Sequence, residues 1–155
     1  MKSRLFTTIV ALSLFSSLAT AQQNPIVGTW ERVSQTDQDG KQNANPYMLV
    51  IFSEDGVFTQ INIAKNRPRI DKPLGELTNE EFRARFTGVQ AVYGTYTIQG
   101  DRITRNVVGA LNPNNEGERL TSQFKIEGNT LIARDTETNV EARFRRVQNG
   151  SLSPR

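Results

Sequence analysis

The 155-residue sequence contains neither cysteine nor histidine. Without cysteine there are no disulfides, so stability must come from burial of apolar surface and from hydrogen-bonded secondary structure. Without histidine the chain lacks the commonest metal ligand and the commonest general base, which excludes Ser-His and Cys-His catalytic arrangements. The sequence also has no phosphate loop, metal-cluster or nucleophile motif. We therefore expect no metal and no cofactor, and an enzyme built from this chain would have to use carboxylates, Tyr, Lys or Arg.

Long apolar runs are also scarce, and the longest belongs to a removable leader. Lys2 and Arg4 precede a mostly apolar stretch at 5–18, and Ala19-Thr20-Ala21 supplies the small residues of a cleavage site. We expect residues 1–21 to be a secretory signal peptide cleaved after Ala21, which makes the protein periplasmic or secreted. The apolar stretch is too short for a membrane span. Because no cysteine follows to carry a lipid, we expect no stable membrane anchor.

Net charge nearly disappears with the leader. Removing Lys2 and Arg4 leaves 17 basic residues (19 − 2) against 16 acidic ones, a net charge of about +1. Such a balance does not favour a nucleic-acid partner. We expect residues 22–147 to form one domain, since this length is enough for a real core, and residues 148–155 to be a disordered polar tail.

What the chain does have is a succession of short strands joined by turns. An apolar run at 47–52 and an alternating run at 57–63 flank Glu54-Asp55-Gly56, which is typical of a hairpin. Further strands are expected at 26–34, 93–98, 102–108, 118–126, 130–134 and 140–147. Eight antiparallel strands with hairpin connections favour an all-β, up-and-down β-barrel, because closure removes both exposed edges. A β-sandwich is the alternative architecture.

One short helix is expected at 79–90, between the third and fourth strands. Thr78 and Glu81 have the spacing of a capping box, and Phe82 and Phe86 recur at helical spacing. The loop before it, at 65–75, contains two prolines and four basic residues. We consider two roles for this helix: a plug over the mouth of the barrel, or a movable lid over a ligand cavity.

Arg105 is the first candidate for ligand binding. It shares a face of its strand with Ile103 and Val107, and a buried arginine needs a carboxylate partner or a bound anion. Alternatively, the other face of the strand points inward, or Arg105 pairs with a structural acid. Further candidate lining residues of a cavity or its mouth, each of which could equally be core or surface, are Phe58, Gln60, Asn62, Arg67, Arg69, Tyr93 and Tyr96.

Two short motifs, one on the first strand and one on the last, carry a family resemblance. Gly28-Thr29-Trp30 on the first strand and Arg145-Arg146-Val147 on the last look like the lipocalin signature, in which an arginine of the final strand covers a tryptophan at the closed end of the barrel. More closely, residues 26–147 resemble the bacterial lipocalin-like domain family. Supporting matches are the Gly28 to Ser34 segment, the hairpin at 50–61, Arg67-Pro68-Arg69 and Gly94-Thr95-Tyr96.

The resemblance implies a lipocalin-like, calycin-type barrel that holds a small apolar ligand, with Gly28, Trp30 and Arg146 closing it. The chain departs from the family at Thr104-Arg105-Asn106, where a histidine or another polar pair is expected. It also departs near Ser122-Gln123, where a basic residue is common. These departures leave the identity of the ligand open.

The sequence thus favours an exported, non-catalytic protein that binds or carries a small apolar or amphipathic molecule. Two alternatives stay open: a small barrel enzyme that isomerises or cyclises an apolar substrate by acid/base chemistry, and a structural or protein-interaction module with a filled core. An empty apolar cavity above about 300 Å³ with Arg105 or a tyrosine inside would favour binding, and a packed barrel would contradict the first two hypotheses together. The oligomeric state does not follow from the sequence.

Overall fold

The computed structural model describes residues 24–43, 46–65 and 67–152, so the expected signal peptide lies outside the described residues. Along these ranges the chain forms the following elements: β1 (Gly28–Thr36), β2 (Gln42–Asn43), β3 (Pro46–Phe52), β4 (Val57–Ala64), η1 (Leu74–Glu76), α1 (Asn79–Phe86), β5 (Val89–Gln99), β6 (Arg102–Ala110), η2 (Pro113–Asn115), β7 (Arg119–Glu127), β8 (Thr130–Asp135) and β9 (Glu141–Arg146).

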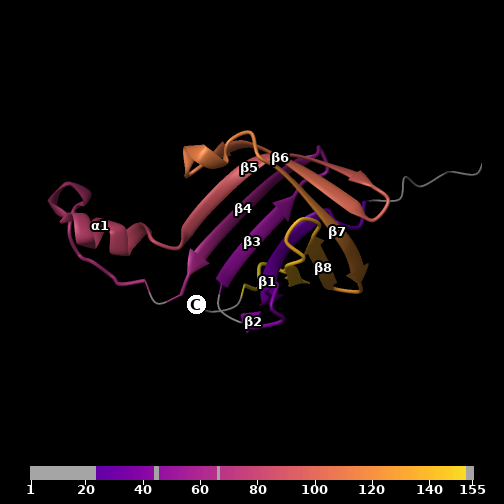
Figure 1. Ribbon diagram of the computed structural model, residues 1–155, viewed down its shortest axis with the longest axis horizontal. Helices are drawn as coiled ribbons and strands as arrows, with labels where there is room; N and C mark the ends of the chain where they lie inside the picture. Colours follow the sequence, from indigo (N-terminus) through magenta and orange to yellow (C-terminus); the bar gives the residue numbers. More distant parts are fainter. Residues whose placement is uncertain (1–23, 44–45, 66, 153–155) are drawn as a thin grey trace, which may run out of the picture.

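The strands form a single antiparallel sheet that closes on itself (Figure 1). Its order is β2-β1-β3-β4-β5-β6-β7-β8-β9, and β1 pairs with β9 as well as with β3. The eight long strands are therefore a closed barrel with sequential strand order, which confirms the predicted all-β antiparallel barrel. β2 is a two-residue strand between the first two predicted strands, paired with the end of β1.

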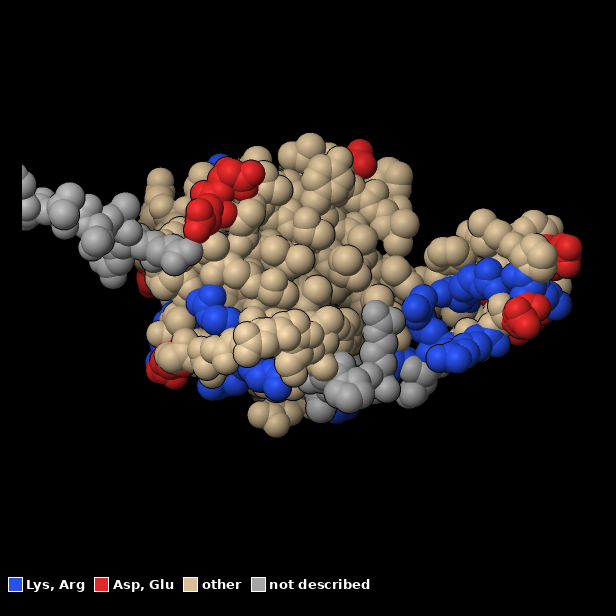
Figure 2. Space-filling view, turned by 180° about the vertical axis from the view of Figure 1, so that it is seen from behind, with Lys and Arg blue, Asp and Glu red and all other residues tan. Residues whose placement is uncertain are grey.

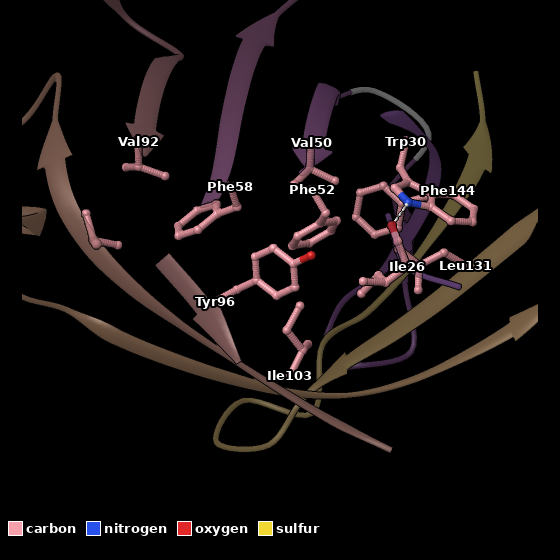
Figure 3. Close-up of a cluster of buried hydrophobic side chains, with 11 residues drawn as sticks. Ile26, Trp30, Val50, Phe52, Phe58, Val92, Tyr96, Ile103, Leu131 and Phe144 are labelled. Carbon is pink, nitrogen blue, oxygen red and sulfur yellow. Dashed lines mark hydrogen bonds between the residues drawn. The ribbon is translucent and has the colours of Figure 1, made fainter. Parts of the chain in front are cut away.

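Alternation along each strand separates the interior from the surface. On β4, Phe58 and Gln60 are buried inside the barrel, whereas Val57, Thr59 and Ile61 are exposed outside it. This is the two-residue period of a pleated strand with one face toward the core. The buried side chains of the other strands join Phe58 in one cluster, which Figure 3 shows on the concave side of the sheet.

One end of the barrel is closed by Trp30 and Arg146. This closed end carries the β3–β4, β5–β6 and β7–β8 turns and the start of β1. Trp30 has 0% exposure, and its indole N–H donates to the carbonyl of Ile26 at 2.7 Å (Figure 3). The Arg146 guanidinium lies 4.1 Å from the centroid of the Trp30 ring and donates to the carbonyls of Val27 and Pro25. A cation over an aromatic face is attracted by the quadrupole of the ring.

Gly28 is needed at this closure. Its φ is +132°, and a Cβ placed there would lie 2.7 Å from Nη1 of Arg146. Any side chain would therefore strain the backbone and push the guanidinium off its carbonyl acceptors.

The helix begins where the sequence predicts but ends earlier. α1 spans Asn79–Phe86 instead of 79–90, and Thr78 and Glu81 form both hydrogen bonds of the capping box, at 3.2 and 2.9 Å. Gly88, with φ +75°, ends the helical segment in a left-handed conformation. The chain then enters β5 at Val89, four residues before the predicted strand start at Tyr93.

The helix does not plug the barrel, so that expected role is wrong. Residues 65 and 67–88, which we call the arm, project from the β4 and β5 ends with α1 away from the barrel (Figure 1). Phe82 and Phe86 are 47% and 39% exposed, and their ring centroids lie 4.7 Å apart. The apolar side chains of the helix thus pack mainly against each other and stay partly exposed. No helix in the described ranges is long and apolar enough to span a membrane.

Candidate ligand-binding site

The barrel encloses a cavity of about 280 Å³. This volume lies just below the range of small-molecule sites, roughly 300–1,000 Å³, so the cavity is slightly smaller than the threshold expected for binding. Most of the wall is apolar, and Met48, Val50, Phe52, Ile103, Leu131 and Phe144 contribute to it. The polar lining residues are Gln60, Arg105, Ser122, Asp135 and Thr138. An apolar wall with a few polar groups is the composition that small-molecule sites have.

Arg105 points into this cavity. Ile103 and Val107, which share its face of β6, are each 3% exposed, so the inward face is the one bearing Arg105. Its Nη1 donates to Oε1 of Gln60 at 2.8 Å, and its Cζ lies 5.9 Å from the centroid of the Phe58 ring. Its Nε is buried and has no hydrogen-bond partner within the described part of the chain.

The positive charge of Arg105 is opposed by the carboxylate of Asp135, which does not form an ion pair with it. Burial lowers the pKa of Arg105 and the carboxylate of Asp135 raises it, but an arginine stays protonated in proteins. Arg105 forms no ion pair with any described residue. The cavity therefore contains a fixed positive charge with an unused N–H donor.

Asp135 lies at the end of β8, where its side chain closes the turn into β9. Its Oδ1 accepts hydrogen bonds from the backbone N–H groups of Glu137 and Thr138, at 3.0 and 2.8 Å, and from the Thr138 hydroxyl at 2.9 Å. Burial raises the pKa of Asp135, but these bonds and the charge of Arg105 outweigh it and hold the pKa below its usual range. Asp135 is consequently ionised at neutral pH.

Three predicted lining residues lie inside the barrel but do not line the cavity. Phe58 is 1% exposed and lies in the core beside Phe52. The Tyr96 hydroxyl donates to the Ser53 carbonyl at 2.7 Å, at the closed end, and burial followed by the charges of Asp55 and Glu54 raises the pKa of Tyr96. Asn62 donates to Oε1 of Gln90 at 2.7 Å, toward the opposite end.

Tyr93 lies on the outer surface, so its predicted placement in the cavity is wrong. The side chain is 54% exposed, and it alternates along β5 with the buried Val92 and Gly94. Its ring lies against Gly109, where no Cβ could fit. Arg67 and Arg69 also lie outside the barrel, on the arm, where they line a separate hollow.

The sequence marked Ser122 only as a departure from the family pattern, and Asp135 and Thr138 were not among its candidate lining residues. The alternation of β7 already places Ser122 on the face of Leu120 and Phe124, so periodicity could have found it. Asp135 continues the alternation of β8, in which Leu131, Ala133 and Asp135 all line the cavity, so periodicity could have found it as well. Thr138 lies in the turn after β8, where no strand period applies.

A closed antiparallel barrel of eight long strands, with a Trp-Arg contact at one end and an internal cavity, defines the lipocalin-like class of fold. A lipocalin-like protein from Bacteroides uniformis ATCC 8492 superposes with a TM-score of 0.54 at 16% sequence identity, over 80% of this chain and 100% of that chain. An uncharacterized protein from Bacteroides eggerthii DSM 20697 gives a TM-score of 0.52 at 14% identity, over 79% and 99%. At such identities the likeness shows the fold alone, and it confirms the resemblance drawn from the sequence at that level. No protein-family model and no curated protein matches the sequence.

Proposed function

We propose that this protein binds or carries a small, largely apolar molecule with one negatively charged end. The observation that supports the proposal is the cavity itself, with an apolar wall and one inward-pointing arginine. A bound anion would give the buried Nε–H of Arg105 the acceptor that it lacks. Because an unmet buried donor costs about 1–3 kcal/mol, and more for a charged group, this interaction favours an anionic end over a neutral one.

Binding is favoured over acid/base catalysis by the charges in the cavity. A general acid or base works best with a pKa near the operating pH. Arg105 stays protonated and the pKa of Asp135 is lowered, so neither group exchanges a proton readily near neutral pH. The cavity likewise weighs against a structural module with a filled core.

The charge preference can be tested with two ligands that differ only in their ends. Octanoate and 1-octanol have the same chain length, and each can be titrated against a fluorescent anionic probe bound to the purified protein. We expect octanoate to compete at lower concentration than 1-octanol. Arg105→Met should weaken octanoate about tenfold, the loss of roughly 1.4 kcal/mol, with little effect on 1-octanol.

Arg119→Met is the matched control, because Arg119 is an exposed arginine on β7. It should leave both titrations unchanged. Equal competition by the two ligands in the unmodified protein would contradict the role of Arg105, and failure of both to compete would contradict binding in the cavity. Native mass spectrometry of the protein purified from its own source would then identify the natural ligand.

We also infer export, from the sequence of residues 1–21. Amino-terminal sequencing of the protein recovered from cells should begin at Gln22. A mature protein that begins at Met1 would contradict this inference.

A further inference from the structure

A second hollow lies outside the barrel, where the arm meets the ends of β3 and β4. It has a volume of about 800 Å³, and Tyr47 and Ile63, which pair with each other across these strands, form its floor. Four of its lining side chains are cationic: Lys65, Arg67, Arg69 and Arg85. Asp71 is the one carboxylate among its lining residues, so the lining carries a net charge of +3 (4 − 1). Figure 2 shows basic side chains along both branches of the arm, around the gap between them.

Two of the arginines are fixed in position by the backbone of the arm. Arg67 donates through Nη1 to the Arg85 carbonyl at 2.9 Å. Arg85 donates through Nη2 to the carbonyls of Ile70 and Lys72, the latter at 3.1 Å. Both residues are half-buried, and a guanidinium has five N–H donors. These bonds therefore hold the guanidinium groups while leaving other donors available at the hollow.

The arm does not neutralise this cluster itself. None of the four cations forms an ion pair with a described residue, and Glu81 pairs with Lys72 instead, at 2.6 Å. Like charges held close together repel, and a hollow that they line concentrates a positive potential. Binding an anion with more than one charge would relieve this repulsion.

We propose that this hollow binds a phosphomonoester. Such a group carries a charge of about −1.5 to −2 at pH 7 and three strong acceptor oxygens. Arginine forks match phosphate oxygens in pairs, and Lys65 adds a mobile charge at the rim. A single carboxylate would offset only a third of the net charge of the lining. The phosphomonoester belongs either to a small soluble molecule or to a phosphatidic acid headgroup, and both offer the same dianionic group.

Calorimetric titration with glycerol 3-phosphate tests the soluble source, and co-sedimentation with phosphatidylcholine vesicles containing phosphatidic acid tests the lipid. We expect saturable binding to at least one probe, weakening as salt is raised. Saturable binding of glycerol 3-phosphate would identify the ligand as a soluble phosphomonoester. Binding to the vesicles alone would identify it as a phosphatidic acid headgroup.

Three variants connect the binding to this hollow. Lys65 and Arg69 are exposed and have no structural hydrogen bond among the described residues, so the double variant Lys65→Gln/Arg69→Gln should fold normally and weaken binding at least tenfold. Asp71→Asn should strengthen binding, because it removes the negative charge of the lining. Arg119→Gln should bind as the unmodified protein does.

Absence of saturable binding to both probes would overturn the proposal, as would an equal loss in Arg119→Gln and in the double variant. The barrel cavity is tested separately. Arg105→Met, which alters only that cavity, should bind glycerol 3-phosphate normally, so either site can fail without the other.

Discussion

At the scale of single residues, Trp30 is the side chain on which closure depends most. It is fully buried, donates to the Ile26 carbonyl and is covered by Arg146. Trp30→Ala removes the ring, its hydrogen bond and the surface under the guanidinium. We expect this variant to lose about 3–5 kcal/mol of unfolding free energy, measured by urea denaturation.

Two further variants separate the contributions to that loss. Trp30→Phe keeps an aromatic ring but loses the bond to Ile26, so it should cost less than the alanine variant. Val33→Ala changes a half-exposed residue on the same strand and should stay within about 0.5 kcal/mol. A Trp30→Ala variant as stable as Val33→Ala would show that closure does not depend on the ring.

Arg105 should have opposite effects on stability and on binding. Replacing a buried charge by an apolar side chain of similar volume is often neutral or stabilising. We therefore expect Arg105→Met to leave the melting temperature of the ligand-free protein unchanged or raised, while octanoate affinity falls. Thermal unfolding with and without octanoate measures both. A marked loss of stability without ligand would instead assign Arg105 a structural role through Gln60.

Strand alternation allowed only part of this site to be predicted. It placed Ile103, Arg105 and Val107 on one face but did not say which face was inward. At Tyr93 alternation was correct and the cavity assignment went against it, since Val92, Gly94 and Tyr96 alternate inward along β5 and Tyr93 lies on the other face. Asp135 shares the inward face of β8 with Leu131 and Ala133, so the same alternation could have found it, whereas Thr138 is brought to the cavity by the turn after β8.

At the scale of elements, the arm shows what local signals can and cannot predict. Thr78 and Glu81 predicted the start of α1, since a capping box acts within one turn. The apolar spacing of Phe82 and Phe86 predicted an amphipathic helix, but spacing does not identify the surface that covers it. Here the two rings lie against each other and stay partly exposed.

The arm should loosen in acid before the barrel does. The hydrogen bond from the Lys72 ammonium, followed by that from the backbone N–H of Thr78, lowers the pKa of Glu81 from 4.5 to about 2. Because the folded pKa is depressed, this contribution is present above about pH 4.5 and is lost as the pH falls toward 2. Amide NMR signals of α1 should therefore shift across that window while strand signals hold. In Glu81→Gln the shift should disappear, and its persistence would point to another group.

At the scale of the whole molecule, the arm and the barrel are separable. The two ends of the arm meet, since the Ala64 N–H donates to the Gly88 carbonyl at 2.8 Å. Replacing residues 65–87 by Asn-Gly, which favours a tight hairpin turn, should leave the barrel within about 1 kcal/mol of its original stability. The shortened protein should still bind octanoate and should lose glycerol 3-phosphate. Failure of this variant to fold would show that the arm supports the barrel.

The global architecture could be predicted because it follows from many consistent local signals. Eight strand patterns with short turns between them leave few arrangements other than a closed barrel. The cavity could not be predicted, since its volume depends on how side chains such as Met48, Phe52 and Phe124 fill the interior together. Packing of this kind is a property of three dimensions that no period in the sequence reports.

The pairing of β1 with β9 also has a consequence for the order of folding. Trp30 and Arg146, which are partners in that pairing, are separated by 116 positions (146 − 30). Contacts between residues so distant in the chain form late and slowly. The barrel therefore cannot be completed until almost the whole polypeptide has been released from the ribosome. Until then the edge of the first strand that β9 covers in the finished barrel stays unpaired.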